Sequence, residues 1–193
     1  HSHPAIDATS GRIRAVQQLE EKGGKVLVLA ADVSNVEDMR IAQRMARDAF
    51  GDIHGVIHAA GVIKDAPILG KSLSDIEAVF TPKIHGTEVL DQLFPDGSLD
   101  WLAVFASSST VTAPAGQVDY VAANAFLNAW AQSRSGGKTR ILALNWGVWA
   151  EVGMAAEAME ARRHPTAALP GRPSGQPLLG DMRDDANGNR QFK

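Results

Sequence analysis

The stretch that most constrains the fold of this chain is Phe105-Ala-Ser-Ser-Ser-Thr-Val-Thr-Ala-Pro-Ala-Gly-Gln-Val-Asp-Tyr120-Val-Ala-Ala-Asn124. The apolar run 101–106 is typical of a short buried strand, and it places Ser107 at the carboxyl end, where open α/β sheets usually hold their ligands. A turn containing proline and glycine follows, and from Tyr120 onward small and apolar residues recur with helical period. We therefore predict a strand, a turn and a helix, with Tyr120 and Asn124 one turn apart on one helix face.

The serine run and the single tyrosine suggest chemistry on a carbonyl group. Ser107 stands thirteen residues before Tyr120, so a hydroxyl and a phenol can reach one substrate oxygen. A free phenol has a pKa of about 10 and is a reluctant acid near neutral pH, but a nearby cation favours its ionised form. A hydride delivered to the carbonyl carbon while Tyr120 protonates the oxygen would turn a ketone into an alcohol, and a cofactor must supply that hydride.

Each of these residues also has a plain structural interpretation. Serine runs at strand ends are commonly parts of loops, and a lone tyrosine is usually a packing residue with a solvated hydroxyl. Ser107, Tyr120 and Asn124 follow one another in strand–turn–helix order, however, and this joint spacing favours a catalytic role. The thirteen-residue interval selects Ser107 over the two serines that follow it, which we expect to be loop residues.

The segment resembles the ketoreductase domain of modular polyketide synthases, a branch of the short-chain dehydrogenase/reductase family. Stand-alone members of that family carry a lysine four residues after the tyrosine, whereas this branch carries asparagine there and takes its lysine from an earlier helix. Asn124 fills the first place, and Lys83 in the run 79–87 fills the second. The resemblance implies that Tyr120 donates the proton and that Ser107 holds the carbonyl oxygen. It further implies that Lys83 tunes the phenol and holds the nicotinamide ribose, with Asn124 supporting the helix and the lysine.

The resemblance covers roughly residues 11–156 and implies an NADPH site. The end of the run 25–33 resembles the pair that contacts the adenine ring, and the small-residue turn after the run 55–58 resembles the one that lies under the cofactor. The Trp-Gly turn after the run 140–146 resembles the one whose backbone meets the nicotinamide carboxamide. The cofactor-binding residues implied in this way are Asp32, Val33, Ala59, Ala60, Gly61, Lys83, Tyr120, Gly147 and Val148.

The predicted fold is α/β, a Rossmann-like doubly wound parallel sheet. No Gly-x-Gly-x-x-Gly turn follows any predicted strand, so we expect an incomplete sheet that lacks the first two strands of the family and its last one. In the family those first two strands lie between the run 25–33 and the run 55–58. Without them, the predicted strand 25–33 would expose the apolar residues 26–29. Whether such a chain binds a dinucleotide is therefore left open.

Helices are expected between these strands, at residues 6–22, 36–50, 74–93 and 120–133. Ser74 and Glu77 form a capping-box pattern at the start of the helix that carries Lys83. Pro82 lies inside that helix and removes one of its hydrogen bonds, so we predict an irregularity that aims Lys83 at the site. We expect His58, in the cofactor turn, to be a hydrogen-bonded loop residue.

Three regions are predicted along the chain. Residues 1–156 form the ketoreductase core, ending where a lid helix is expected to begin at 153–163, and residues 157–175 are rich in Pro, Gly and Ala, as linkers are. The run Gln176-Pro-Leu-Leu-Gly180 resembles the beginning of a polyketide dehydratase domain, so residues 176–193 are either that beginning or a disordered polar tail.

The composition excludes several classes of function. The chain is 45% hydrophobic and 21% charged, its net charge is −3, and no run approaches the length of a membrane span. The slight acidity argues against nucleic acid as a partner. Because the chain has no cysteine, disulfides and thiol catalysis are excluded, and with no signal-peptide pattern a cytoplasmic location is the default. The histidines lack metal-ligand spacing, so we expect no metal.

These features predict a ketoreductase that uses NADPH to reduce a β-ketoacyl thioester on an acyl carrier protein, alongside other polyketide synthase domains. The alternatives are a stand-alone short-chain reductase, which Asn124 disfavours, and a non-catalytic scaffold, which would explain the missing glycine turn. One ketoreductase class carries Leu-Asp-Asp soon after the cofactor turn, and the other carries tryptophan eight residues before the tyrosine. This chain has Ile63-Lys64-Asp65 and Thr112 there, which favours the first class and a D-configured alcohol.

Overall fold

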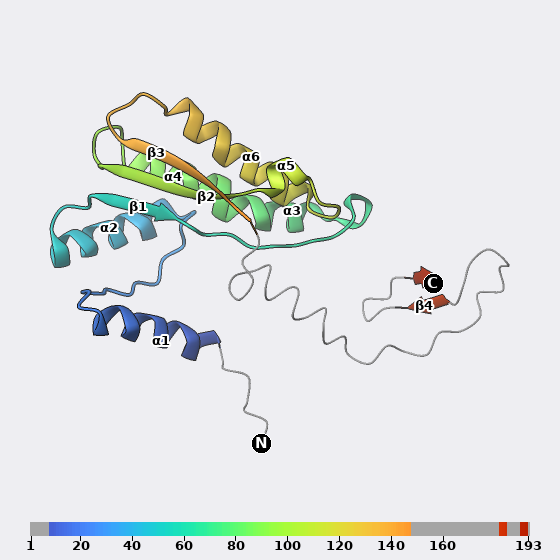
Figure 1. Cartoon of the computed structure of the whole chain (residues 1–193), viewed down its shortest axis with the longest axis horizontal. Coiled ribbons are helices and arrows are strands. Elements are labelled where there is room, and N and C mark those ends of the chain that lie inside the picture. Colours follow the sequence, from blue (N-terminus) through green and yellow to red (C-terminus); the bar gives the residue numbers. More distant parts are fainter. Residues whose placement is uncertain (1–7, 148–181, 185–189, 193) are drawn as a thin grey trace, which may run out of the picture. The chain divides into compact units, whose positions relative to one another are not determined.

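The computed structural model of the chain describes residues 8–147, 182–184 and 190–192 (Figure 1). The chain divides into two compact units, residues 1–147 and 148–193. In the second unit, β4 (Met182–Asp184) and β5 (Arg190–Phe192) pair in antiparallel orientation, within the stretch predicted as a dehydratase beginning or a tail. The expected lid helix, the linker and Val148 lie outside the described residues.

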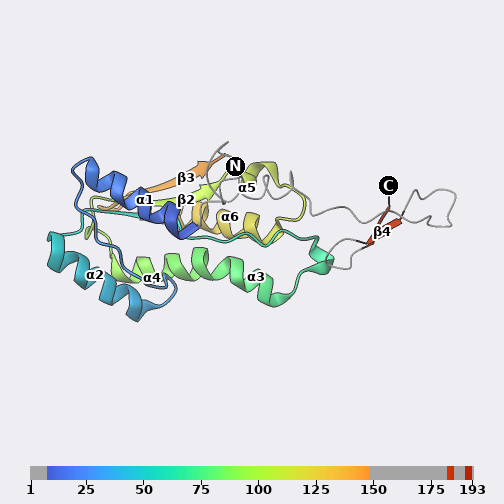
Figure 2. The ribbon, with the colours of Figure 1, turned by 90° about the horizontal axis from the view of Figure 1, so that it is seen from below.

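The first unit contains a parallel sheet of three strands. They are β1 (Gly55–His58), β2 (Trp101–Ser107) and β3 (Arg140–Trp146), and their order across the sheet is β1-β2-β3. Helical segments connect consecutive strands and lie on one side of the sheet in both views (Figures 1 and 2). The predicted Rossmann-like α/β fold with parallel strands is thereby confirmed.

The hydrophobic core lies between this sheet and the helices on its covered side. Alternate residues of β2 point into it, and Leu102 and Val104 are almost fully buried there. They pack with residues of the flanking helical segments, including Leu90, Phe94 and Leu127. This packing fixes the position of β2, whose last residue is Ser107.

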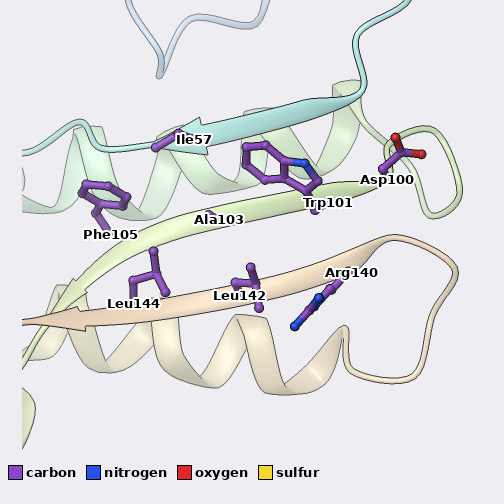
Figure 3. A pocket seen from close by; sticks show the side chains of 8 residues that line it. All are labelled: Ile57, Asp100, Trp101, Ala103, Phe105, Arg140, Leu142 and Leu144. Atoms are coloured by element: carbon purple, nitrogen blue, oxygen red, sulfur yellow. The ribbon is translucent and has the colours of Figure 1, made fainter.

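The other face of the sheet carries a shallow hollow of about 590 Å³ (Figure 3). Its walls are the side chains that alternate with the core residues, together with charged groups at the strand starts. Gly55 lies beneath it, and a Cβ there would overlap the ring of Trp101 and force that ring to move. The lining residues are Ile57, Asp100, Trp101, Ala103, Phe105, Arg140, Leu142 and Leu144. None of the proposed catalytic residues is among them, so the hollow is not the candidate site.

The strand predicted at residues 25–33 does not form. Residues 24–32 have no regular secondary structure, and Leu27 and Val28 are 39% and 70% exposed. The apolar residues suit a strand, but a strand also needs a neighbour for its backbone hydrogen bonds, and no strand in the described ranges pairs with this run. The expected exposure of residues 26–29 is confirmed for Leu27 and Val28, whereas Val26 and Leu29 are half-buried and the strand prediction is wrong.

The helices largely follow the expected ranges, with one interruption. The described helices before the sheet are α1 (Ala8–Glu21) and α2 (Val36–Phe50), and those after β2 are α5 (Ser109–Thr112) and α6 (Val118–Ser133). A short 3₁₀ turn, η1 (Ile68–Gly70), precedes the helix expected at 74–93. That helix is divided into α3 (Leu73–Phe80), a π-helical turn η2 (Thr81–His85) and α4 (Gly86–Leu93).

The cap of α3 differs from the predicted one. Ser72 is the N-cap, and its Oγ accepts a hydrogen bond from the backbone N–H of Asp75 at 3.1 Å. The Ser72 hydroxyl also donates to the Asp75 carboxylate, at 2.6 Å. Ser74 lies inside the first turn, so the prediction of a Ser74–Glu77 capping box is wrong, and the observed N-cap is two residues earlier.

Candidate active site

Lys83 reaches the interior through the π-helical turn. Pro82 lacks the N–H that a regular helix would use, and the wider π-helical turn lies at this point in the chain. The Lys83 residue is 3% exposed, and its Nζ donates a hydrogen bond to the carbonyl oxygen of Phe105 at 2.9 Å. The predicted irregularity at Pro82 is confirmed, and Lys83 faces inward.

Lys83 also lies beside Tyr120, at the start of α6. The Lys83 Nζ is 5.6 Å from the centre of the Tyr120 ring, within the range of a cation–π contact. Burial disfavours the ammonium form and lowers the pKa of Lys83 from 10.5 to about 8. At neutral pH the side chain therefore still carries its charge next to the half-buried phenol ring.

Asn124 is completely buried one turn after Tyr120. Its Nδ2 donates to the Tyr120 carbonyl oxygen at 2.7 Å. Its Oδ1 is buried without a hydrogen-bond partner among the described residues. Because buried polar atoms are nearly always hydrogen-bonded, this oxygen is suited to accept from a water or a ligand.

Ser107 ends β2, as the sequence predicted, and its hydroxyl is hydrogen-bonded within its own turn. The Ser107 Oγ accepts from the backbone N–H of Ser109 at 3.1 Å, and the Ser107 carbonyl accepts from the Thr110 hydroxyl at 2.9 Å. Ser107 follows Phe105, the residue that holds Lys83, by two positions. The serine hydroxyl is therefore fixed at the carboxyl edge of the sheet on which the lysine is also anchored.

The small-residue turn after β1 passes over Lys83. A Cβ added to Gly61 would lie 3.0 Å from the Lys83 Cε, so glycine lets the backbone approach the lysine without displacing it. Ala60 and Gly61 are half-buried and Ala59 is exposed. These three residues and Lys83 thus share one edge of the sheet.

His58 differs from its prediction, because it is the last residue of β1 and is 3% exposed. Burial, with a smaller contribution from the charge of Lys83, lowers the pKa of His58 to about 4, while backbone groups of Lys83 and Pro82 oppose the shift. Its Nε2 lacks a hydrogen-bond partner within the described part of the chain. His58 is therefore a neutral, packed ring at the end of a strand and not a loop residue.

The predicted adenine contacts lie on the approach to α2. Asp32 is exposed, and its carboxylate accepts from the backbone N–H and the hydroxyl of Ser34, at 2.9 and 2.7 Å. These hydrogen bonds lower the pKa of Asp32. Val33 is half-buried against the start of α4, where a Cβ on Gly86 would lie 2.9 Å from the Val33 Cγ1. Val33 is thus packed close to the Lys83 turn, and Gly147 is exposed just after β3.

A buried ion pair that was not predicted from the sequence lies beside Tyr120. The Lys71 Nζ lies 2.7 Å from the Asp119 Oδ2, and each side chain is 1% exposed. The two residues are 48 positions apart, and no pattern in the sequence pairs them. The signal that could have drawn attention to Asp119 is its place directly before Tyr120.

Comparison with known proteins identifies the family. A family model described as the KR domain matches residues 4–151. This chain belongs to the ketoreductase family. It is 38% identical over 144 residues to polyketide synthase PksM of Bacillus subtilis (strain 168), covering 73% of this chain and 3% of that protein. It is 34% identical over 153 residues to the 6-methylsalicylic acid synthase of Aspergillus terreus (strain NIH 2624 / FGSC A1156), covering 79% of this chain and 8% of that protein.

A solved ketoreductase has the same arrangement of elements. The crystal structure of an N-terminal ketoreductase from the macrolactin assembly line superimposes with a TM-score of 0.68 and 32% identity. The match covers 76% of this chain and 30% of that one. The ketoreductase chain described here therefore spans a small part of the length of its curated relatives and about a third of this solved ketoreductase. Ketoreductase domains of polyketide synthases are oxidoreductases that bind a nicotinamide cofactor.

The described residues form neither a metal site nor a membrane-spanning helix. No group of three or more His, Asp or Glu side chains in the described ranges is arranged to hold a metal ion. Within the same ranges, no helix has the length and apolar character that crossing a membrane requires.

Proposed function

We propose that this chain carries the catalytic residues of a polyketide synthase ketoreductase that reduces a β-ketoacyl thioester, held on an acyl carrier protein, with NADPH. The observation that carries the proposal is the position of Lys83, a buried cation 5.6 Å from the Tyr120 ring and bonded to the strand that ends at Ser107. This arrangement supports proton transfer to a carbonyl oxygen at the carboxyl edge of the sheet.

The residues at this edge fit the nicotinamide end of the cofactor. Gly61 leaves space over Lys83 that a Cβ would fill, and the buried Oδ1 of Asn124 is an acceptor still to be satisfied. We assign the nicotinamide ribose to Lys83 and Tyr120 and the carboxamide to the backbone at Gly147 and Val148. The turn 59–61 would lie under the cofactor, with the adenine contacts at residues 32–33. When bound, NADPH supplies a hydride to the substrate carbonyl carbon.

Residues of this chain then bind and protonate the carbonyl oxygen. Ser107 donates a hydrogen bond to that oxygen and fixes its position. Tyr120 gives the oxygen its phenolic proton, and the charge of Lys83 stabilises the phenolate that remains. Asn124 keeps the first turns of α6 in place through its hydrogen bond to the Tyr120 carbonyl. The Lys83 charge is present at neutral pH because its pKa is about 8.

The direct test is Tyr120→Phe in the full-length enzyme that contains this segment. Loss of a general acid lowers turnover by about a hundredfold to ten thousandfold. We expect loss of β-keto reduction with an unchanged melting transition. Trp130→Phe, an aromatic substitution on the same helix, is the matched control and should keep its activity. Turnover by Tyr120→Phe at the wild-type rate would refute the proposal.

NADPH binding by the purified chain is a separate test. We expect saturable cofactor fluorescence and a melting temperature that rises with NADPH concentration, because a ligand that binds the folded state stabilises it. The full-length enzyme provides the reference titration. Binding by the full-length enzyme and none by this chain would show that residues 1–193 alone do not hold the dinucleotide.

A further inference from the structure

A buried ion pair lies directly beside the proposed proton donor. Lys71 follows η1 by one residue, and its Nζ lies 2.7 Å from the Asp119 Oδ2. With each side chain 1% exposed, both charges are almost completely removed from water. Such a pair is costly to bury and demands good geometry, so it strongly favours one arrangement of the two segments that it joins.

The two oxygens of the Asp119 carboxylate accept hydrogen bonds from different segments. The Oδ1 accepts the backbone N–H of Tyr120 at 2.9 Å, and the Oδ2 accepts from Lys71. Tyr120 lies in the first turn of α6, where backbone N–H groups have no partner inside the helix. Asp119 therefore ties the main chain of Tyr120 to the side chain of Lys71.

Lys71 in turn holds the loop 59–72 that leads away from β1. Its Nζ also donates to the carbonyl oxygen of Lys64, which closes residues 64–71 into a compact loop. Lys64 belongs to the run Ile63-Lys64-Asp65 that bears on the predicted stereochemistry. The loop and the tyrosine are thus connected through two side chains that solvent does not reach.

Two further contacts join the same loop to the residues before Tyr120. The Gln117 Nε2 donates to the Asp65 Oδ2 at 2.8 Å, and the Ala66 N–H donates to the Gly116 carbonyl at 3.0 Å. A hollow of about 330 Å³ lies alongside, between η1 and the turn that leads into α6.

We propose that Lys71 and Asp119 are positioning residues that hold Tyr120 and the loop 59–72 in one fixed relation. This inference rests on the proposed role of Tyr120 as proton donor. The pair does not touch the reacting atoms, and it acts through the backbone of Tyr120 and through Lys64. If the pair is broken, the phenol and the loop move independently, and a displacement of about 1 Å can lower turnover by about a hundredfold. The substrate can then also present either face of its carbonyl group.

The test uses two variants of the full-length enzyme. Lys71→Met removes the cation and leaves Asp119 charged, whereas Lys71→Met/Asp119→Asn leaves no buried charge and keeps an acceptor for the Tyr120 N–H. We expect both to lower kcat by about a hundredfold, with an unchanged KM for NADPH. We also expect both to form a larger fraction of the alcohol of opposite configuration. The product ratio does not depend on how much enzyme is folded, so a merely structural role would leave it unchanged.

The matched control breaks an ion pair at the other end of α6. Arg134 pairs with Asp91, and its side chain is 20% exposed. It lies about 20 Å from Tyr120 along the helix axis. Arg134→Met should keep the wild-type kcat and product ratio. Equal losses in this control would overturn the proposal, because they would reflect general destabilisation.

Three further results would each have a distinct meaning. A folded double variant with the wild-type kcat and product ratio would overturn the positioning role. Failure of both variants to fold would also overturn it, because the pair would then serve folding alone. Wild-type turnover by Tyr120→Phe would instead refute the proposed function itself, whatever the Lys71 variants do.

Discussion

Replacing Lys83 by methionine should make the folded chain more stable near neutral pH. Burial lowers the pKa of Lys83 from 10.5 to about 8, which corresponds to about 3 kcal/mol against the charged form in the folded state. Methionine has a similar length and carries no charge. It loses the hydrogen bond to the Phe105 carbonyl, which contributes about 1 kcal/mol. We expect Lys83→Met to raise the free energy of unfolding by about 2 kcal/mol at pH 7.

The pH dependence of this difference follows from proton binding. Below pH 8 the Lys83 side chain is charged in both the folded and the unfolded chain, so the wild type bears the whole cost of burying the charge, about 3 kcal/mol. Between pH 8 and 10.5 the unfolded chain binds more protons than the folded one, so wild-type stability rises with pH. Lys83→Met lacks this rise. The free energy by which Lys83→Met exceeds the wild type in stability should therefore shrink between pH 8 and 10.5. Near pH 10.5 the variant should be less stable than the wild type by about 1 kcal/mol.

Urea unfolding of the two chains at pH 7 and pH 10 measures this difference. Lys22→Met, which replaces an exposed lysine in the turn after α1, is the matched control and should show no such pH dependence. A lower urea midpoint for Lys83→Met at pH 7 would refute the argument that Lys83 is costly to bury. A difference that stays constant up to pH 10 would refute the assigned pKa.

Two other predictions concern the surroundings of the site. Ala113 has a φ of 43°, a left-handed conformation that strains residues with a Cβ, so Ala113→Gly should raise the free energy of unfolding by about 1 kcal/mol in urea titrations; an unchanged midpoint would contradict this. The His85 ring contacts Glu77 at 3.0 Å and Glu88 at 3.3 Å, and these contacts raise the pKa of His85 above 6.5. The stability from this cluster should be fully present below pH 6.5 and lost as pH rises through the folded-state pKa, and NMR titration should show Glu77→Gln moving the His85 pKa back toward 6.5.

The three strands of the sheet could be predicted because each contains an apolar run, and each run pairs with a neighbouring strand. The run 25–33 has the same apolar character and forms no strand. Side-chain preference is a property of the run itself, whereas strand formation also depends on the neighbouring strand that its backbone can pair with. Local sequence therefore could not distinguish the run 25–33 from the run 101–107.

The cap of α3 shows that a local sequence pattern can also fail to locate the first residue of a helix. Ser72 and Ser74 each have an acidic residue three positions later, so both satisfy the capping pattern. The structure selects Ser72, whose hydroxyl oxygen accepts from the Asp75 N–H. The pattern alone could not select between two serines that differ only in where the helix begins.

The two buried lysines show which part of the site the sequence could not reveal. Lys71 has a carboxylate partner, Asp119, so its charge is satisfied inside the protein and serves to hold two segments together. Lys83 has a carbonyl oxygen and the Tyr120 ring as partners, and no carboxylate pairs with it in the described part of the chain. A buried cation without a counter-ion is costly, and its field is left to act on whatever negative charge develops nearby. The resemblance could identify Lys83, but the difference between a structural and a reactive lysine depends on partners that are distant in sequence.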